Sequence, residues 1–295
     1  MKKVTTIVLI PIGPSCENSF ISDTIQSVIF YLKLDYEIVL VDDSGCSKGS
    51  LLKEKFKDIT VLETKGSTGH FAGLYFTLSY GLKYVYENFL FDFVLRMDTD
   101  ALLIGCGLDQ VAVDFFKENP DRGIIGSYMV DCNGDPRGIY WTGVQLQKEM
   151  KIKFLIKDTF KKFKGWSFLR TVYRKSKKNG YIDGEHCMGG AYLMSWKCVK
   201  ELNDKLLLDR REIYFTQLQE DQIFGLLIYS IGFSHADFAT GDLPMGLRWR
   251  GLPCSPQELV KRNKKITHST RFFENMGEEE IRKFFRERRI LKNNS

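Results

Sequence analysis

The sequence predicts an α/β fold in which a mostly parallel sheet is flanked by helices, in a single domain with an inserted basic segment. Two patterns support this prediction. The first third of the chain alternates short apolar runs with stretches of helical spacing, as in successive βαβ units. Polar clusters directly follow these apolar runs, as they do where parallel strands end and ligands bind. The composition, 43% hydrophobic and 27% charged over 295 residues, excludes a disordered chain, a collagen and a disulfide scaffold.

The apolar runs of the first third place its elements. Strands are expected over residues 4–11, 36–41, 59–63 and 91–97, and helices over 22–34, 51–56 and 71–86. The N-terminus resembles a signal peptide, because two lysines precede an apolar run. That run is short and β-branched, and it meets Pro11, Gly13 and Pro14 rather than a small-residue cleavage site. We therefore interpret it as a buried first strand.

The second part of the chain is less regular. Strands are expected over residues 123–129 and 189–195, a helix over 222–231 and a basic tail over 281–292. The apolar runs are about half as long as the roughly twenty residues that a membrane-spanning helix needs. The seven cysteines form no C-x-x-C pair, which argues against a zinc site or a disulfide framework. Reduced thiols in a cytoplasmic protein are the expectation.

The net charge of +6 is unevenly distributed. Residues 148–178 contain twelve Lys or Arg against only Glu149 and Asp158, so this segment carries +10 and the remainder about −4. Large apolar residues are interleaved with these lysines. Two interpretations stay open: a peripheral helix on an anionic membrane surface, or a helix packed on the core with a solvated basic face. Nucleic acid is not expected as a partner, because the aromatics form one cluster.

Asp98-Thr99-Asp100 is the most informative motif, since it directly follows an apolar strand. In an extended segment, residues two apart point to the same side, so both carboxylates can bind one ion. Oxygen ligands of this kind suit Mg²⁺ or Mn²⁺ held together with substrate phosphates. The alternative is a structural turn, in which aspartates are common.

Three further sites each have a structural alternative. Asp42-Asp43 ends the second strand, where it can bind a nucleobase or ribose, or form a turn and a helix N-cap. The pair of Glu220 and Asp221 precedes an apolar helix, where it supplies a general base or merely complements the helix dipole. A lone histidine such as His268 is more often structural than a metal ligand.

Four segments follow one another in this order: a strand followed by VDDSG, a strand followed by MDTD, CMGGAYLMSW and QEDQIFGLLIYSIGF. On these segments, the chain resembles the family 2 glycosyltransferases of the GT-A fold over about residues 4–240. The resemblance implies a nucleotide-binding half over residues 1–103, an acceptor half over 104–250 with a basic insertion at 148–180, and a C-terminal tail over 251–295. It implies a metal-dependent, inverting transferase of the hexosyltransferase type that moves a sugar from a nucleotide-sugar, in particular a UDP-sugar.

The resemblance also implies a role for each matching residue. Asp98 and Asp100 would hold Mn²⁺ or Mg²⁺ and the donor diphosphate, and Asp221 would deprotonate the acceptor hydroxyl. His268 resembles the late histidine that completes the metal site of many GT-A enzymes. Glu220 would lie on the acceptor side. The remaining donor-binding residues would be Pro11 and Ile12 beside the base, Asp43 on the base, and Gly189 and Gly190 beneath the sugar.

The chain departs from the family pattern at two places. GSTGHFAGLYF replaces the usual A-R-N segment, which leaves His70 or the backbone of 66–69 as candidate donor contacts. Residues 246–249 resemble the Q-x-x-R-W of processive synthases but place Met245 at the Gln position, so processivity is not expected. Trp249 is a candidate for stacking on an acceptor sugar.

The expected acceptor is a saccharide or lipid-linked molecule of surface polysaccharide or glycolipid synthesis, and the expected location is the cytoplasm, at the inner face of the membrane. A retaining transferase of similar fold, a nucleotidyltransferase and a non-enzymatic sugar- or membrane-binding protein are the alternatives. The nucleotidyltransferase is disfavoured because the loop after the first strand, IPIGPSCENS, contains no Lys or Arg.

Overall fold

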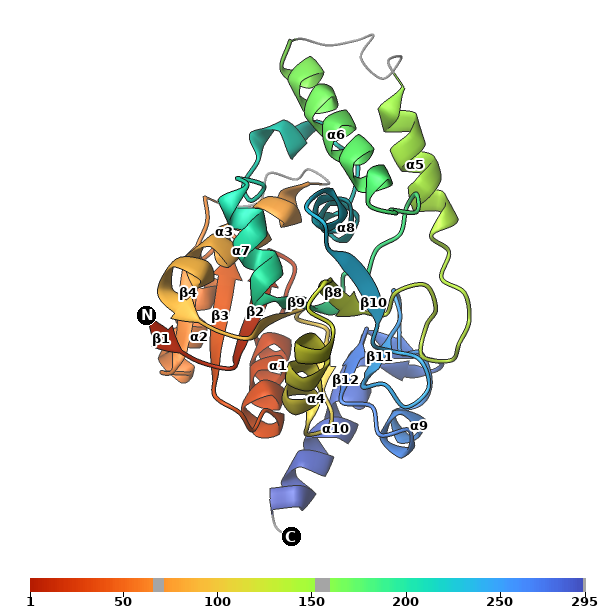
Figure 1. The fold of residues 1–295 in the computed structure, drawn as a ribbon. Helices are drawn as coiled ribbons and strands as arrows, with labels where there is room; N and C mark the ends of the chain where they lie inside the picture. Colours follow the sequence, from red (N-terminus) through yellow and green to blue (C-terminus); the bar gives the residue numbers. More distant parts are fainter. Residues whose placement is uncertain (66–71, 152–159, 294–295) are drawn as a thin grey trace.

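The computed structural model describes residues 1–65, 72–151 and 160–293, which form a single α/β domain around a seven-stranded sheet (Figure 1). The strand order is β10-β8-β9-β6-β2-β3-β4. The strands are β2 (Thr6–Ile12), β3 (Tyr36–Asp42), β4 (Ile59–Glu63), β6 (Phe93–Met97), β8 (Arg122–Gly126), β9 (Ala191–Ser195) and β10 (Ser234–Asp237). The mixed, mostly parallel sheet confirms the predicted fold class.

The direction of β9 decides which loops meet. This strand runs antiparallel to both β6 and β8, whereas the other neighbouring pairs are parallel. Met97 at the end of β6 pairs with Ala191 at the start of β9. The residues just before β9 therefore lie at the same sheet edge as the residues just after β6.

Helices cover both faces of the sheet because alternate strand residues point to opposite sides. Along β2, Ile7 and Leu9 enter one buried cluster, while Val8 and Ile10 enter another. The first cluster packs against α3 (Gly73–Asn88), α6 (Phe160–Lys178), α7 (Trp196–Asp204) and α8 (Glu220–Ser230). The second packs against α1 (Asn18–Tyr31), α2 (Lys48–Lys55) and α4 (Leu108–Glu118). Figure 1 shows α1 and α4 on one side of the sheet and α3, α7 and α8 on the other.

A second, three-stranded sheet lies beside the carboxyl edge of the first. It joins β7 (Leu102–Leu103), β12 (Ile266–His268) and β11 (Met245–Leu247), with β12 in the middle. The C-terminal helix α10 (Glu278–Asn293) contributes Ile281 and Phe285 to a small core under this sheet. Residues 251–293 are therefore folded against the domain rather than forming a tail. The short elements are β1 (Lys2–Lys3), β5 (Phe89–Leu90), η2 (Arg211–Phe215), α9 (Pro256–Lys261), β13 (Phe272–Phe273) and β14 (Met276–Gly277).

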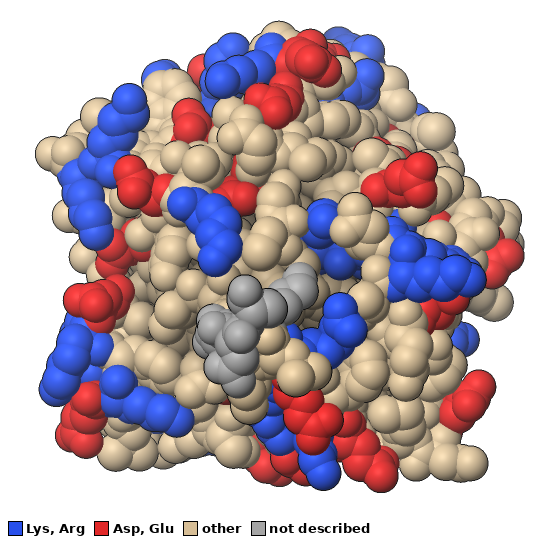
Figure 2. Space-filling view, turned by 90° about the horizontal axis from the view of Figure 1, so that it is seen from below, with Lys and Arg blue, Asp and Glu red and all other residues tan. Residues whose placement is uncertain are grey.

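The basic insertion contains α6, which projects from one end of the molecule together with the preceding helix α5 (Tyr140–Met150) (Figure 1). Leu169 and Val172 of α6 are buried in the core, whereas its aromatic residues Trp166 and Phe168 are half-buried and Phe163 is exposed. Basic side chains such as Arg174 and Lys175 are exposed. Figure 2 views the molecule from below, at the end opposite to α5 and α6. Basic and acidic side chains are intermixed on this face.

Element boundaries differ from the predicted ones by a few residues. The strand expected over 59–63 has those bounds, and the one expected over 123–129 already ends at Gly126. Within the described residues, none of the helices combines the length and the apolar character needed to cross a membrane. All seven cysteines are free thiols.

Candidate active site

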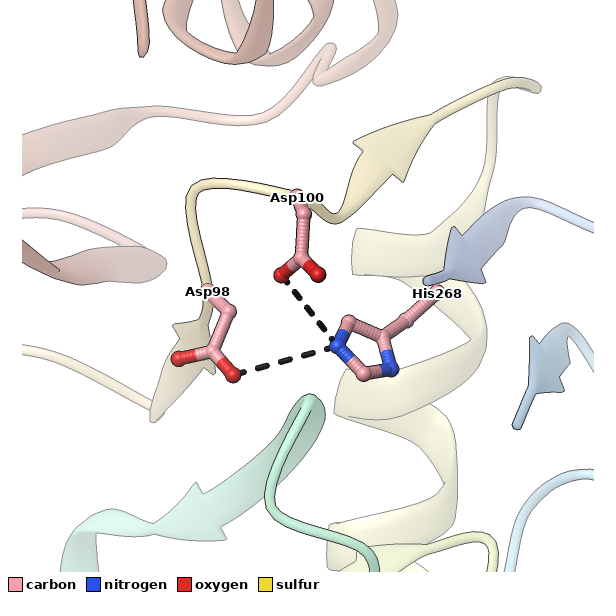
Figure 3. A group of neighbouring side chains, drawn as sticks. All are labelled: Asp98, Asp100 and His268. Atoms are coloured by element: carbon pink, nitrogen blue, oxygen red, sulfur yellow. Dashed lines mark ion pairs between the residues drawn. The ribbon is translucent and has the colours of Figure 1, made fainter. Parts of the chain in front are cut away.

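Three side chains with metal-ligating atoms converge beyond the end of β6. Asp98 and Asp100 lie on the turn that follows the strand, and His268 is the last residue of β12. Their ligand atoms all lie within 4.8 Å of one another. His268 Nε2 is 3.2 Å from Asp100 Oδ1 and 3.8 Å from Asp98 Oδ2 (Figure 3). The structure thus brings together the residues that sequence analysis proposed as a metal site.

The His268 ring is oriented with Nε2 facing the two carboxylates. Its Nδ1 is 2.8 Å from the carbonyl oxygen of Arg248, which can only accept, so Nδ1 carries a proton. Nε2 is therefore the nitrogen that would bind a metal, while Nδ1–H is held by a carbonyl as in metal-bound histidines. Gly190 packs directly against the ring, because a Cβ at this position would overlap His268. Glycine is therefore the residue that leaves room for the ring.

The two aspartates differ in electrostatic environment. Burial raises the pKa of Asp98 and outweighs the opposing charges of Arg96 and His268. Burial also acts to raise the pKa of Asp100, but the hydrogen bond and charge of His268 and the charge of Arg271 together hold it well below its usual range. Arg271 Nε lies 2.8 Å from Asp100 Oδ2. Asp100 is consequently ionised at any physiological pH.

This donor set fits a divalent cation. Carboxylate oxygens with an imidazole nitrogen suit Mn²⁺ and similar ions. The fit rests on the position of His268 Nε2, 3.2 Å from Asp100 Oδ1 and 3.8 Å from Asp98 Oδ2, where a cation would replace a proton between the three side chains. A cation at this point would neutralise the repulsion between the carboxylates.

Arg96 connects the metal-site residues to the acidic pair of α8, and sequence analysis missed it. The side chain is 2% exposed, and one Nη atom lies 2.9 Å from Asp98 Oδ1 and 3.2 Å from Glu220 Oε1. Burial raises the pKa of Glu220 to about 8, against the lowering effect of Arg96. Glu220 is therefore largely protonated at neutral pH. The available signal was a single arginine inside the apolar strand preceding Asp98.

Asp221 lies in the first turn of α8, next to the glycine pair. Its Oδ2 accepts a hydrogen bond from the Gly189 amide at 3.0 Å, and its Oδ1 accepts one from the Gln222 amide at 2.8 Å. The carbonyl oxygen of Gly190, the second glycine of the pair, accepts a hydrogen bond from the Asp98 amide at 2.9 Å. The glycine pair thus separates Asp221 from the metal-site residues at one sheet edge.

A buried histidine and a half-buried arginine, also missed, lie beside Asp221. His186 Nε2 is 3.7 Å from Asp221 Oδ2. His186 Nδ1 donates to the carbonyl of Gly184 at 2.7 Å, and its Nε2 faces Arg137 Nη2 at 3.1 Å, which donates to it. Burial lowers the pKa of His186, so the ring is neutral. The sequence shows no metal-ligand spacing around this histidine, and Arg137 and Asp221 are distant from it in the chain.

The predicted base-binding residues lie at the ends of β2 and β3. Leu9 pairs with Arg96, so Pro11 and Ile12 extend to the same edge as Asp98. The Asp43 amide donates to the carbonyl of Ile12 at 2.9 Å, and the Asp43 carboxylate accepts from the Thr64 hydroxyl. These residues therefore form the part of the edge next to the metal-site turn.

Asp42 takes the structural role considered for this acidic pair. Its carboxylate accepts hydrogen bonds from the amides of Ser44 at 2.9 Å and Gly49 at 2.6 Å, which fixes the turn into α2. The half-buried Asp43 is left as the ligand-binding candidate.

Trp249 follows Arg248, whose carbonyl holds His268, and 66% of its surface is exposed. The guanidinium of Arg250 lies 4.4 Å from the centre of its ring. Trp249 is thus an exposed aromatic residue next in the chain to the one that contacts the metal-site histidine. The other donor candidates, His70 and the backbone of 66–69, lie outside the described residues.

No family model matches this sequence, and no curated protein sequence matches it. Solved glycosyltransferase structures are similar to this chain. The chain is similar to the apo structure of the bifunctional glycosyltransferase WbbM, with a TM-score of 0.52 and 13% identity over 97% of this chain and 50% of that one. Two further similar structures are S. aureus TarS 1–349 (TM-score 0.46, 17% identity, 80% and 58% coverage) and the mannosyltransferase PcManGT from Pyrobaculum calidifontis with GDP-Man and Mn²⁺ (0.46, 14%, 81% and 56%).

The chain spans between half and three fifths of the length of these solved chains. The likeness to WbbM shows that it has the GT-A-type fold.

Proposed function

We propose that this protein is a metal-dependent, inverting glycosyltransferase that uses a nucleotide-sugar donor, in particular a UDP-sugar, and an acceptor hydroxyl of a surface polysaccharide or glycolipid. The observation that carries the proposal is the convergence of Asp98, Asp100 and His268 at the strand-end edge, with Asp221 across the glycine pair. The GT-A-type fold shared with a glycosyltransferase supports it.

The donor would lie along the carboxyl edge of the main sheet. Pro11 and Ile12 would line the pocket for the base, and Asp43 would accept a hydrogen bond from it. Gly189 and Gly190 would lie beneath the sugar, where the absence of side chains allows close approach. The order of these residues along adjacent strands supports this path.

Asp98, Asp100 and His268 would hold Mn²⁺ or Mg²⁺, which when bound offsets the negative charge of the departing nucleoside diphosphate. Arg96 holds the Asp98 carboxylate from the buried side of the site. The carbonyl of Arg248 fixes the His268 ring so that Nε2 faces the aspartates. These contacts orient the ligands before the donor binds.

Asp221 would accept the proton of the attacking acceptor hydroxyl. The amides of Gly189 and Gln222 hold its two oxygens, so the carboxylate keeps one orientation while it accepts a proton. Its neighbour Glu220 is already largely protonated near neutral pH and is less suited to this role. Glu220 and Trp249 would contact the acceptor. Attack from the side opposite the leaving group inverts the anomeric configuration, and anomeric analysis of the product distinguishes this from retention.

Donor recognition is tested by thermal unfolding of the protein with a panel of nucleotide sugars, with and without Mn²⁺. At a hundred times its dissociation constant, a ligand adds about 2.7 kcal/mol to the stability of the folded state. We expect a rise in Tm with one nucleotide class that depends on Mn²⁺. Equal, metal-independent responses to all nucleotides would contradict the proposal.

We further propose that the exposed basic face of α6 holds this cytoplasmic enzyme at an anionic membrane surface. Each Lys or Arg near such a surface contributes on the order of 1 kcal/mol. Reversing the exposed Arg174, Lys175 and Lys178 to Glu is therefore expected to abolish co-sedimentation with phosphatidylserine vesicles at low salt. A control reversal of the exposed Lys57, Lys261 and Lys283, on other elements, is expected to retain binding. Failure of the unmodified protein to bind at low salt would refute this role.

A further inference from the structure

Arg282 of α10 is fully buried, and its guanidinium reaches away from its own helix. One Nη atom donates to the carboxylate of Asp23 at 3.1 Å and to the carbonyl of Phe20 at 3.2 Å, both on α1. The guanidinium also lies 4.8 Å from the centre of the Phe20 ring. A fully buried arginine with this many partners fixes the position of α10 against α1.

The same guanidinium holds the turn between the two aspartates of the metal site. Its second Nη atom donates to the carbonyl of Thr99 at 2.7 Å. The Thr24 hydroxyl of α1 donates to the same carbonyl at 2.7 Å. Thr99 lies between Asp98 and Asp100, so the orientation of its peptide group determines how the two carboxylates are presented.

A second branch of the same contacts reaches the segment that carries His268. Glu278 Oε1 accepts from Arg282 Nε at 2.8 Å and from the Thr270 hydroxyl at 3.1 Å. The Thr270 amide donates to the carbonyl of Asp100 at 2.9 Å, and the single proton of the Thr270 hydroxyl can be donated either to Glu278 or to that carbonyl, which is 3.0 Å away. Thr270 is two residues beyond His268. The Arg282–Glu278 pair therefore joins the two segments that supply the three candidate ligands.

We propose that Arg282 is a positioning residue for the metal site and that α10 acts, through Arg282 and Glu278, as a clamp on the Asp98–Asp100 turn and the 268–270 segment. This inference rests on the metal site of the proposed function. The contacts run through backbone carbonyls and Thr270 rather than through the ligand atoms. Groups that hydrogen-bond the ligands themselves typically change metal affinity by about 10- to 100-fold when removed, and Arg282, which acts one contact further out, is expected at the lower end of this range.

The helix offers a matched control. Arg289 is also buried in α10 and also binds the Asp23 carboxylate. Within the described residues, Arg289 pairs with Asp23, whereas the contacts of Arg282 extend to Thr99. Replacing either arginine with Met removes a buried guanidinium from the same carboxylate. Only the Arg282 replacement also releases the turn.

The experiment measures Mn²⁺ binding by titration calorimetry, and backbone amide hydrogen exchange over residues 98–101 and 268–271, on the full chain. Arg282→Met is expected to weaken Mn²⁺ binding by about 10-fold or more and to speed exchange of the Thr270 amide, which donates to Asp100. Arg289→Met is expected to leave both readouts near those of the unmodified protein. Arg282→Lys is expected to bind Mn²⁺ more tightly than Arg282→Met and less tightly than the unmodified protein, since its ammonium group replaces only part of the guanidinium's contacts.

Unchanged Mn²⁺ affinity and unchanged exchange in folded Arg282→Met would overturn the inference. If Arg282→Met does not fold, Glu278→Gln serves instead, and it is expected to weaken Mn²⁺ binding in the same direction; unchanged binding overturns the inference. If the unmodified protein binds no Mn²⁺, the proposed metal site is refuted. A selective change of exchange in Arg282→Met would then still support the clamp, so the two failures are distinguishable.

Discussion

Asp221→Asn is expected to lower turnover by about 10² or more while leaving donor affinity nearly unchanged. Asparagine keeps the shape of aspartate, and its side-chain oxygen can still accept from the Gly189 amide, while its NH2 group replaces the oxygen that accepts from the Gln222 amide. It cannot accept a proton from an acceptor hydroxyl. Steady-state rates at saturating donor and acceptor, together with donor titration calorimetry, separate the two effects.

Glu220→Gln provides the matched control for this prediction. The Glu220 carboxyl is adjacent and buried, and its raised pKa of about 8 means that glutamine imitates the form present near neutral pH. We expect a much smaller loss of turnover than in Asp221→Asn. A larger loss in Glu220→Gln would assign the base to Glu220. Loss of donor affinity with normal turnover in Asp221→Asn would make Asp221 a binding residue.

Asp100→Ala is expected to abolish Mn²⁺-dependent donor binding. The Asp100 carboxylate is ionised, lies 3.2 Å from His268 Nε2 and accepts from the Ser269 hydroxyl at 2.9 Å, so its loss removes a ligand and frees its neighbours. Mn²⁺ and nucleotide titrations would measure the effect, with circular dichroism to check the fold. Asp43→Ala, at the proposed base pocket, is the control: it should weaken nucleotide binding and leave Mn²⁺ binding intact. Full Mn²⁺-dependent activity in Asp100→Ala would contradict the metal site.

The sequence carries enough information to place the acidic residues of the site but not their supports. Asp98 and Asp100 could be predicted because they directly follow an apolar strand, and strand periodicity is a local property. The pairing of β9 with β6 brings Gly190 to His268, and no local pattern encodes that contact. Arg96 was missed because it lies inside an apolar strand, and the apolar residues around it are enough to predict that strand.

The C-terminal region shows the same limit more strongly. Its arginines indicate a solvated basic tail when read alone, because the buried carboxylate that Arg282 and Arg289 share, Asp23, lies more than 250 residues away on α1. In the structure, Asp23 binds Arg282 and Arg289, and this pairing makes the segment an amphipathic, anchored helix. The small sheet of β7, β12 and β11 was missed for a related reason, since its strands are two or three residues long.

The most direct test of the central claim is release of nucleoside diphosphate from a panel of nucleotide sugars by the unmodified protein, with Mn²⁺ or with EDTA. We expect one donor class to be turned over with Mn²⁺, slowly to water and faster once a suitable saccharide or lipid-linked acceptor is added. EDTA is expected to stop the release, and added Mn²⁺ to restore it. Equal release with EDTA, or binding of Mn²⁺ and nucleotide with no release from any donor and acceptor pair, would contradict the assignment as a metal-dependent glycosyltransferase.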